Sequence, residues 1–413
     1  MRVAVAGAGA FGRNHLRVYR ELESAAQGVA LVAAVEPDSA RAAETAAQYG
    51  IPVFSSVDRL LGAGLNIEAA SVAVPTVHHH AVAAELLDAG MDVLVEKPLA
   101  ASLAEADDLI ARAQRGKRIL QPGHLERFNP AVLAVEPRLR RPMFFEAHRL
   151  SVFTPRALDV DVVLDLMIHD LDIVLTFAAS PVREIRAVGL PILSPKVDIA
   201  NVRVEFESGC VANFTASRVS TERVRKLRFF EPRQYVSIDY ARRDVLVIRI
   251  DPPPAAVGAT SGQGSEANGA LAEAGAEFLK TGKLDAATMQ AVMASGKVPA
   301  GLMMKVLAAK NDPEKLKEIA KGLAGSLAEP HDGPAPGLSF VKPEVAPGEP
   351  LKLELSAFLD SVRTRRPPRV TAGQGRAALA LALEIQAAMV AHAERAGLGD
   401  FFRSGPESGA DSL

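Results

Sequence analysis

The chain has 413 residues, 48% of them hydrophobic, so it is long enough for two or three domains with sizeable cores. Its net charge of −2 and pI of about 6.5 argue against a nucleic-acid-binding protein or one that binds anionic membranes. The single cysteine, Cys210, excludes an internal disulfide and fits a reducing compartment. Because the first residues predict a strand rather than a signal peptide, and no apolar run reaches roughly 18–20 residues, we expect a cytoplasmic protein.

The first part of the chain, to about residue 120, alternates β-rich runs with amphipathic helical runs. This alternation predicts a parallel sheet that is covered by helices on both faces. Ser102 and Glu105 form a capping box at one helix start, and Gly50 and Gly90 stand where helices end. We assign residues 1–122 to a doubly wound Rossmann domain of the α/β class. Its predicted strands are Arg2–Ala6, Val29–Val35, Val53–Phe54, Ala70–Val74, Asp92–Val95 and Arg118–Gln121, and its predicted helices include Ser39–Tyr49, Ala81–Ala89 and a stretch to Ala113.

The pattern changes after Phe128, where a helical stretch, Val162–Ala178, is followed by six predicted strands. Several of these strands alternate apolar and polar residues, as in a half-exposed antiparallel sheet. Two further helices are predicted at Lys352–Arg363 and Gly375–Ala396. Residues 123–250 and 351–400 therefore predict an α+β domain with a large open, mainly antiparallel sheet. The six strands are Glu184–Gly189, Val202–Glu207, Val211–Ser217, Arg225–Phe230, Tyr235–Tyr240 and Val245–Ile250.

Residues 251–350 interrupt this order. Both ends of the segment are rich in Pro and Gly, whereas its middle is Lys-rich with a helical pattern, so we predict a helical insertion bordered by loops. Nothing in its sequence assigns it a role. Residues 403–413 are predicted to form a flexible tail.

A glycine-rich motif, Gly7-x-Gly9-x-x-Gly12, follows the first strand and opens a helix. In a βαβ unit, Gly7 permits the tight turn, Gly9 lets the backbone approach a pyrophosphate, and Gly12 lets the helix pack on the strand. Glu36 ends the second strand, where a carboxylate accepts hydrogen bonds from the ribose hydroxyls and repels a 2′-phosphate. The motif therefore predicts a site for NAD rather than NADP. The alternative is an ordinary glycine turn with a surface glutamate.

Glu96, Lys97 and Pro98 end a predicted strand at the carboxyl edge of the sheet, where ligands of open α/β sheets bind. A lysine there can donate a proton or hold a substrate oxygen, and the proline permits a cis bond that would aim it inward. For an isolated Lys-Pro pair, a surface lysine that caps a strand is the better interpretation.

Asp165 and His169 are four residues apart in a largely apolar helical stretch, which predicts that they share one helix face and line a pocket. Histidine can take the proton of an alcohol while hydride leaves the same carbon, and Asp165 could orient the imidazole. A purely structural pair is an equal alternative. A metal could be held by Asp165, His169 and Asp172 together. No further cluster of ligands supports such a site, so we expect no metal. The triplet at residues 78–80 indicates a polar helix start rather than a metal site.

Residues 218–243 contain eight Lys or Arg against three acidic residues. A nucleotide diphosphate is one partner that such a segment could bind. An exposed sheet face of mixed charge, or an oligomer contact, explains the same composition.

These motifs together resemble the Gfo/Idh/MocA oxidoreductases over about residues 1–250 and 350–395. The resemblance lies in GAGAFGRNH, VPTVHH, the EKP that follows, GHLERFNP and DLMIHD. It implies a Rossmann domain joined to an open-faced sheet domain that binds substrate and often mediates dimers or tetramers. It implies a catalytic trio of Lys97, Asp165 and His169, with a cis bond after Lys97. The implied cofactor contacts, beyond the glycines and Glu36, are Phe11, Arg13, Pro75, Thr76, His79 and Glu96, and our candidates for substrate binding are His124, Arg127, Arg149 and Arg156.

Within the family, GHLERFNP, DLMIHDLDIVL and the GEPLKLELSAFLDSVRTRRPP tail resemble UDP-N-acetylglucosamine 3-dehydrogenases. That resemblance implies NAD-dependent oxidation of a UDP-sugar at C3 on the way to a diamino-sugar lipid A. It also implies a homodimer or homotetramer with no nucleic-acid or membrane partner. The alternatives are a dehydrogenase of a free polyol or inositol, and a non-catalytic NAD-sensing regulator. The intact trio argues against the regulator.

Overall fold

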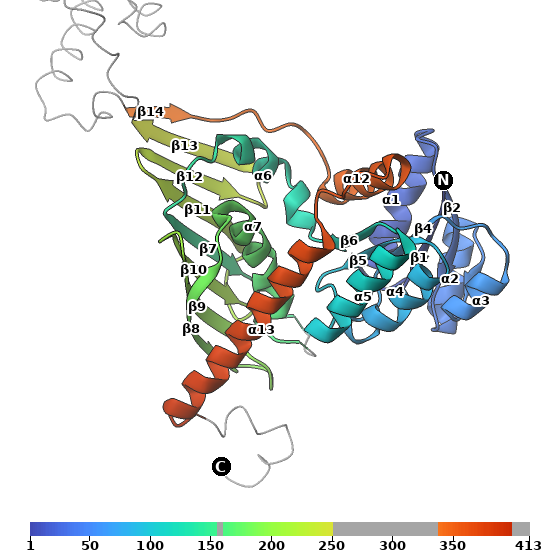
Figure 1. Cartoon of the computed structure of the whole chain (residues 1–413), viewed down its shortest axis with the longest axis horizontal. Coiled ribbons are helices and arrows are strands. Elements are labelled where there is room, and N and C mark those ends of the chain that lie inside the picture. Colours follow the sequence, from blue (N-terminus) through green and yellow to red (C-terminus); the bar gives the residue numbers. More distant parts are fainter. Residues whose placement is uncertain (155–159, 251–337, 399–413) are drawn as a thin grey trace, which may run out of the picture. The chain divides into compact units, whose positions relative to one another are not determined.

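The computed structural model describes residues 1–154, 160–250 and 338–398, which contain two sheets (Figure 1). The first sheet has the order β3-β2-β1-β4-β5-β6, and its strands pair in parallel. The chain changes direction across the sheet between β1 and β4, which is the topological switch point of a Rossmann fold. The predicted α/β class is therefore confirmed. The strands are β1 (Arg2–Ala6), β2 (Ala30–Val35), β3 (Val53–Phe54), β4 (Ala69–Val72), β5 (Asp92–Glu96) and β6 (Leu120–Gly123).

Both faces of this parallel sheet are buried. Val3 and Val5 of β1 belong to a core that includes residues of α1, whereas Ala4 and Ala6 belong to a core that includes residues of α4 and α5. Side chains alternate between the faces of a strand, so each strand contributes to both cores. The helices of this part are α1 (Gly12–Ser24), α2 (Ser39–Tyr49), α3 (Val57–Gly62), α4 (His79–Asp88) and α5 (Leu103–Gly116), with one 3₁₀ turn, η1 (Thr76–His78).

The capping residues predicted for three helices agree with the structure, with one adjustment. Some helix ends differ: α4 begins at His79 rather than Ala81, and α5 ends at Gly116 rather than Ala113. The Ser102 hydroxyl accepts a hydrogen bond from the Glu105 amide, but the Glu105 carboxylate accepts from the Ala101 amide rather than from that of Ser102. Gly50 is the left-handed C-cap of α2, and Gly90, with φ of +84°, follows the cap of α4.

A C-terminal helix, α12 (Pro350–Thr364), packs on the first sheet. Leu351, Leu355 and Phe358 are spaced to share one helix face, and all three join the core beneath α1. The helix also contacts the 3₁₀ turn Leu125–Phe128, which follows the Rossmann domain, so its assignment to the second domain stays a prediction.

The second sheet has eight strands in the order β14-β13-β12-β11-β7-β10-β9-β8 and is mainly antiparallel, as predicted. A parallel pair, β7 with β10, lies in the middle of the sheet. Two of its strands, β7 and β14, were missed by the sequence analysis, and β14 lies inside the range predicted for the insertion. The strands are β7 (Phe144–Leu150), β8 (Val182–Leu190), β9 (Ile199–Phe206), β10 (Val211–Ser217), β11 (Val224–Glu231), β12 (Gln234–Asp239), β13 (Asp244–Ile250) and β14 (Leu338–Val341).

One face of this sheet is covered by α7 (Ile168–Ala178) and α13 (Ala372–Arg395), which lie side by side (Figure 1). By length and composition alone, α13 could span a membrane. However, Leu381, Ile385 and Met389 are buried in the core beneath the sheet, so α13 is a core helix here. The remaining elements are the 3₁₀ turns η2 (Leu125–Phe128) and η3 (Glu136–Arg138), the helix α6 (Pro130–Val135) and a π-helical turn, η4 (Val163–Met167).

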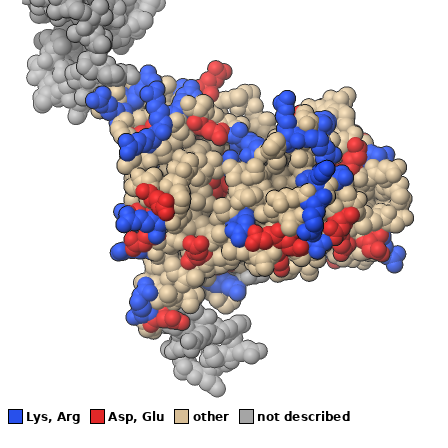
Figure 2. Space-filling view, viewed as in Figure 1, with Lys and Arg blue, Asp and Glu red and all other residues tan. Residues whose placement is uncertain are grey.

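Several predictions fall on residues outside the described ranges. They are the substrate candidate Arg156, most of the insertion and the C-terminal tail. On the face of the molecule that Figure 2 shows, acidic and basic side chains are interspersed rather than separated by sign.

Candidate active site

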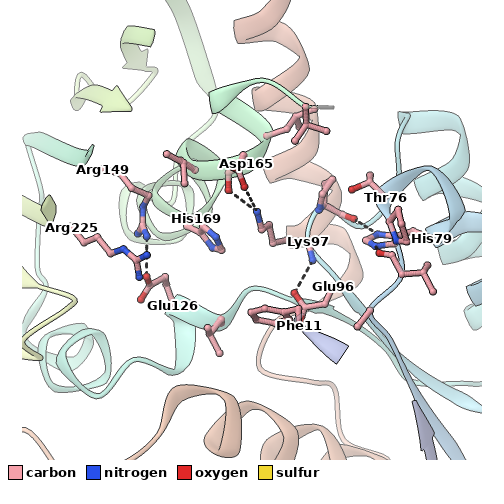
Figure 3. A pocket seen from close by; sticks show the side chains of 18 residues that line it. Phe11, Thr76, His79, Glu96, Lys97, Glu126, Arg149, Asp165, His169 and Arg225 are labelled. Carbon is pink, nitrogen blue, oxygen red and sulfur yellow. Dashed lines mark hydrogen bonds and ion pairs between the residues drawn. The ribbon is translucent and has the colours of Figure 1, made fainter. Parts of the chain in front are cut away.

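A cavity of about 460 Å³ lies at the carboxyl edge of the parallel sheet (Figure 3). Segments that follow β1, β4 and β5 form one side of it, and the second domain supplies the other side through β7, β11 and the η4–α7 segment. Ligands of open α/β sheets bind at this edge. The lining residues that the sequence predicted are Phe11, Pro75, Thr76, His79, Glu96, Lys97, Arg149, Asp165 and His169, and those it did not predict include Leu125, Glu126, Leu164 and Arg225.

Lys97 reaches from the first domain into the cavity. Its Nζ donates to the backbone oxygen of Asp165 at 2.6 Å and lies 3.6 Å from the Asp165 Oδ1 (Figure 3). Burial lowers the pKa of Lys97, although the carboxylates of Asp165 and Glu96 partly offset this effect. The Lys97–Pro98 peptide bond is cis, as expected.

His169 lies on α7 and faces the same cavity as Lys97 (Figure 3). Its Nδ1 is buried and has no hydrogen-bond partner within the described part of the chain. Burial lowers the pKa of His169 well below its ordinary value, and the positive charges of Lys97 and Arg149 lower it further. The imidazole is therefore neutral, which is the form that accepts a proton.

Asp165 does not orient His169 as the sequence suggested. It belongs to the π-helical turn before α7, and both its backbone oxygen and its carboxylate face Lys97 instead. The four-residue spacing predicted one shared helix face on regular α-helical geometry, which the π turn does not follow. The structure thus places Asp165 as the partner of the lysine.

Two histidines of the first domain support the cavity wall. His15, buried on α1, bonds through Nε2 to the Glu96 Oε1 at 2.9 Å. The Nδ1 atom of His79 lies 2.8 Å from the Pro98 carbonyl oxygen, and its Nε2 atom lies 3.0 Å from the Val74 carbonyl oxygen. His79 therefore holds the segments after β4 and β5 together at the edge of the cavity. The sequence did not single out His15, although it ends the GAGAFGRNH motif.

The glycine loop has the shape that a dinucleotide requires. Gly7 has φ of +93°, and a Cβ there would lie 2.6 Å from the Ala73 carbonyl oxygen. A Cβ at Gly12 would lie 1.9 Å from the Gly7 oxygen, whereas a Cβ at Gly9 would meet no atom within 4 Å. Gly7 and Gly12 thus permit the turn and the helix packing, while Gly9 leaves open space next to the backbone, as expected for the approach of a pyrophosphate.

Glu36 ends β2 beside this loop and is only 4% exposed. Its carboxylate accepts hydrogen bonds from the amides of Ala8 and Asp38 and from Arg41, each at 3.0 Å. Burial raises the pKa of Glu36, but these donors outweigh burial and hold it below its ordinary value. Arg13, the remaining predicted cofactor contact, is exposed on α1 and pairs with Glu44 at 3.3 Å.

Arg149 lines the cavity, but its charge is already neutralised. It binds both oxygens of Asp170 at 2.7 and 3.0 Å, donates to Glu126 at 3.1 Å, and stacks over the Tyr240 ring. Arg225 of β11 also lines the cavity and is exposed, and no hydrogen bond or ion pair is found for its side chain among the described residues. The basic segment 218–243 was the only signal that pointed to it.

His124 and Arg127 lie outside the set of cavity-lining residues. Both are buried, with Arg127 bonded to Thr176 and 3.6 Å from the Asp172 Oδ1, and with His124 3.9 Å from the other oxygen of Asp172. This placement favours a supporting role over the direct substrate contact expected from the sequence. Asp172 therefore faces these two residues, and the described residues contain no group of three potential metal ligands.

Comparison with known proteins agrees with this geometry. Residues 1–124 match the model of an oxidoreductase family, Gfo/Idh/MocA, described as an NAD-binding Rossmann fold. Residues 131–232 match the model of the C-terminal domain of the same family. The two matches together cover more than half of the chain.

Individual relatives point in the same direction. A UDP-N-acetylglucosamine 3-dehydrogenase of Acidithiobacillus ferrooxidans is 38% identical over 241 residues, which are 58% of this chain and 74% of the relative. A solved structure of the enzyme of that name and organism has a TM-score of 0.70 at 28% identity, covering 95% of this chain and 98% of that one. An inositol 2-dehydrogenase of Saccharopolyspora erythraea is 32% identical over 167 residues, or 38% of this chain and 49% of the relative.

Proposed function

Because the chain belongs to the Gfo/Idh/MocA family of NAD-binding oxidoreductases, we propose that it oxidises the C3 hydroxyl of UDP-N-acetylglucosamine to the 3-keto sugar. The observation that carries this proposal is the meeting of Lys97 and His169 in one cavity at the edge of the NAD-binding domain. Burial lowers the pKa of both side chains, which brings that of Lys97 closer to neutral pH and keeps His169 in the neutral form that accepts a proton.

The chemistry divides into a hydride and a proton. NAD, held by the glycine loop and Glu36, supplies the acceptor for the hydride that leaves the carbon. The hydroxyl proton must pass to a base within hydrogen-bond reach. We assign that role to Lys97 and His169 together, with the substrate oxygen held between them. Asp165 positions Lys97 through its backbone oxygen and its carboxylate.

The charges at the cavity support a nucleotide-linked sugar. Arg149 is committed to Asp170 and Glu126, whereas Arg225 is exposed and available to an anionic group. A guanidinium is a good partner for a diphosphate because it can donate two parallel hydrogen bonds. The named relative with the highest identity given above also acts on a UDP-sugar. The keto product would suit a later amination, as a route to a diamino-sugar lipid A requires.

The substrate is tested by measuring NADH formation with UDP-N-acetylglucosamine, free N-acetylglucosamine and myo-inositol. We expect turnover with the UDP-sugar only, and a rise in melting temperature when NAD and the UDP-sugar are both present. The variant Arg225→Ala should raise the KM for the UDP-sugar with a smaller change in kcat. Turnover of myo-inositol without turnover of the UDP-sugar would overturn the proposal.

A second candidate is oxidation of a free inositol. It is favoured by the partial match to an inositol 2-dehydrogenase, which covers 38% of this chain. A free inositol has no anionic group that Arg225 could bind, so we rank oxidation of inositol below oxidation of the UDP-sugar. In the assay above it predicts equal turnover of myo-inositol by the unmodified protein and by Arg225→Ala.

We further propose a cytoplasmic homodimer or homotetramer. A UDP-sugar and NAD are both cytoplasmic reactants, and the open sheet offers a face for association. Sedimentation of the purified protein decides between monomer, dimer and tetramer.

A further inference from the structure

The carboxylate of Glu36 does not stand free to meet a ribose. Its Oε1 accepts from the Asp38 amide and from Arg41 Nη2, and its Oε2 accepts from the Ala8 amide, all at 3.0 Å. A carboxylate offers about four acceptor positions, two on each oxygen. Only one position, on Oε2, therefore remains for a ribose hydroxyl while the Arg41 contact lasts.

Arg41 is placed to respond to the cofactor. It lies in the first turn of α2, and its side chain is 48% exposed while the carboxylate that it binds is 4% exposed. Within the described residues its guanidinium makes one hydrogen bond, through Nη2, and approaches Asp38 only to 4.0 Å. Most of its N–H donors thus have no partner among the described residues.

A positive charge at this position changes how Glu36 selects a cofactor. A carboxylate alone repels the 2′-phosphate of NADP, whereas an arginine nearby accommodates it. In this chain the Glu36 carboxylate and the Arg41 guanidinium are in contact, so the positive charge offsets part of the repulsion between the carboxylate and a 2′-phosphate. The nearest other base on these elements, Arg13, is paired with Glu44.

We propose that Arg41 is a specificity-determining residue that weakens the discrimination of Glu36 against NADP. With NAD bound, Arg41 keeps the Glu36 carboxylate in place and adds a donor beside the ribose. With NADP, it turns from Glu36 to the 2′-phosphate. The protein then prefers NAD but also binds NADP measurably. This inference rests on the NAD-binding site of the proposed function, and it does not depend on which sugar is oxidised.

The test is direct binding of NADH and NADPH to the free protein, followed by nicotinamide fluorescence. We expect Arg41→Ala to weaken NADPH binding about tenfold, because one charge-assisted hydrogen bond is lost, while NADH binding changes much less. Arg41→Lys, which keeps the charge, should bind NADPH more weakly than the unmodified protein but more tightly than Arg41→Ala. Arg59→Ala is the matched control, since Arg59 is exposed on α3 and away from the glycine loop.

A second pair of variants isolates the coupling of the two groups. Glu36→Gln should improve NADPH binding, and this gain should be smaller in the double variant with Arg41→Ala, where only the repulsion by the carboxylate is removed. An unchanged ratio of the two affinities in Arg41→Ala would overturn the proposal, as would a gain of the same size with and without Arg41. Failure of the unmodified protein to bind either cofactor would overturn the site itself, whereas failure of sugar turnover alone would not.

Discussion

Gly9 and Gly12 stand in the same loop but have opposite surroundings. A Cβ at Gly12 would lie 1.9 Å from the Gly7 oxygen and 2.8 Å from its carbonyl carbon, both backbone atoms. A Cβ at Gly9 would meet nothing within 4 Å, and Gly9 is not among the glycines with positive φ. Alanine at the two positions should therefore separate a glycine needed by the fold from one needed by the cofactor.

The expected magnitudes follow from these distances. Real Cβ contacts shorter than 3.0 Å are essentially never seen, so Gly12→Ala must push α1 from the loop by about 1.1 Å, the difference between 3.0 and 1.9 Å. Such overpacking destabilises a protein by about 1–3 kcal/mol or more. Gly9→Ala should leave stability unchanged but keep the pyrophosphate from the backbone. Losing one charge-assisted hydrogen bond of about 1.5–3 kcal/mol weakens NAD binding about 10- to 150-fold.

The assay pairs thermal unfolding of the protein without cofactor with a fluorescence titration of NADH. Gly62→Ala is the matched control, because a Cβ there also meets nothing within 4 Å and Gly62 lies at the end of α3. We expect an unchanged melting temperature and weak NADH binding for Gly9→Ala, and losses in both for Gly12→Ala. Normal NADH affinity in Gly9→Ala would refute the assignment of this loop to the pyrophosphate.

Four further predictions concern other parts of the chain. His169→Ala and Lys97→Ala should each lower single-turnover NADH formation by about 10²- to 10⁴-fold with little change in NAD affinity, and near-normal turnover in both would show that the active site is elsewhere. Glu36→Ala should weaken NADH binding and bring it closer to NADPH binding, whereas equal use of both cofactors by the unmodified protein would refute its role. If neutral His169 is the base, kcat/KM should fall as the pH drops through its lowered pKa, and Arg225→Ala, by removing a charge that lowers this pKa, should move the fall to higher pH. Replacing residues 251–337 with a short turn between the neighbouring strands β13 and β14 should leave NADH binding intact, and loss of the folded N-terminal domain would show that the segment is structural.

Much of the Rossmann domain could be predicted from sequence because its signals are local. Strand–helix alternation and glycine caps depend on residues close together in the chain, and β1 and α2 begin and end where they were predicted. Strand β14, which lies inside the predicted insertion of residues 251–350, was missed for the opposite reason. Leu338–Val341 is a short edge strand within a Pro- and Gly-rich stretch, and only its pairing with β13 makes it a strand.

Strand β7 shows the same limit in the middle of the second sheet. Phe144–Leu150 alternates partly buried and buried residues, as a strand with one covered face should. One of its partly buried positions is the apolar residue Phe144, so apolar and polar residues do not alternate clearly in the sequence of this strand. The apolar face of α12 could be read from the sequence, but its contacts with α1 could not, because they join residues far apart in the chain.

The site was predictable as a set of residues but not as a set of contacts. Lys97 and His169 face one cavity, although they lie in different domains and no local pattern connects them. The pairing of Asp165 with Lys97 depends on a π-helical turn that the spacing of residues does not reveal. His15 was missed because its role exists only through its contact with Glu96.

The charges around α7 connect substrate binding with proton transfer. Burial lowers the pKa of His169 most, and the charges of Lys97, Arg149 and Arg225, which all line the cavity, lower it further. Of these cations, Arg149 binds Asp170 and Lys97 lies beside Asp165, whereas the side chain of Arg225 has no partner among the described residues. On the proposed function, the same charge of Arg225 that attracts a diphosphate also lowers the pKa of the imidazole. A bound diphosphate would screen that charge and let the pKa of His169 rise, so the imidazole becomes a stronger base once the substrate is in place. The protein would thereby keep His169 neutral before binding and strengthen it as a proton acceptor only in the complex that reacts.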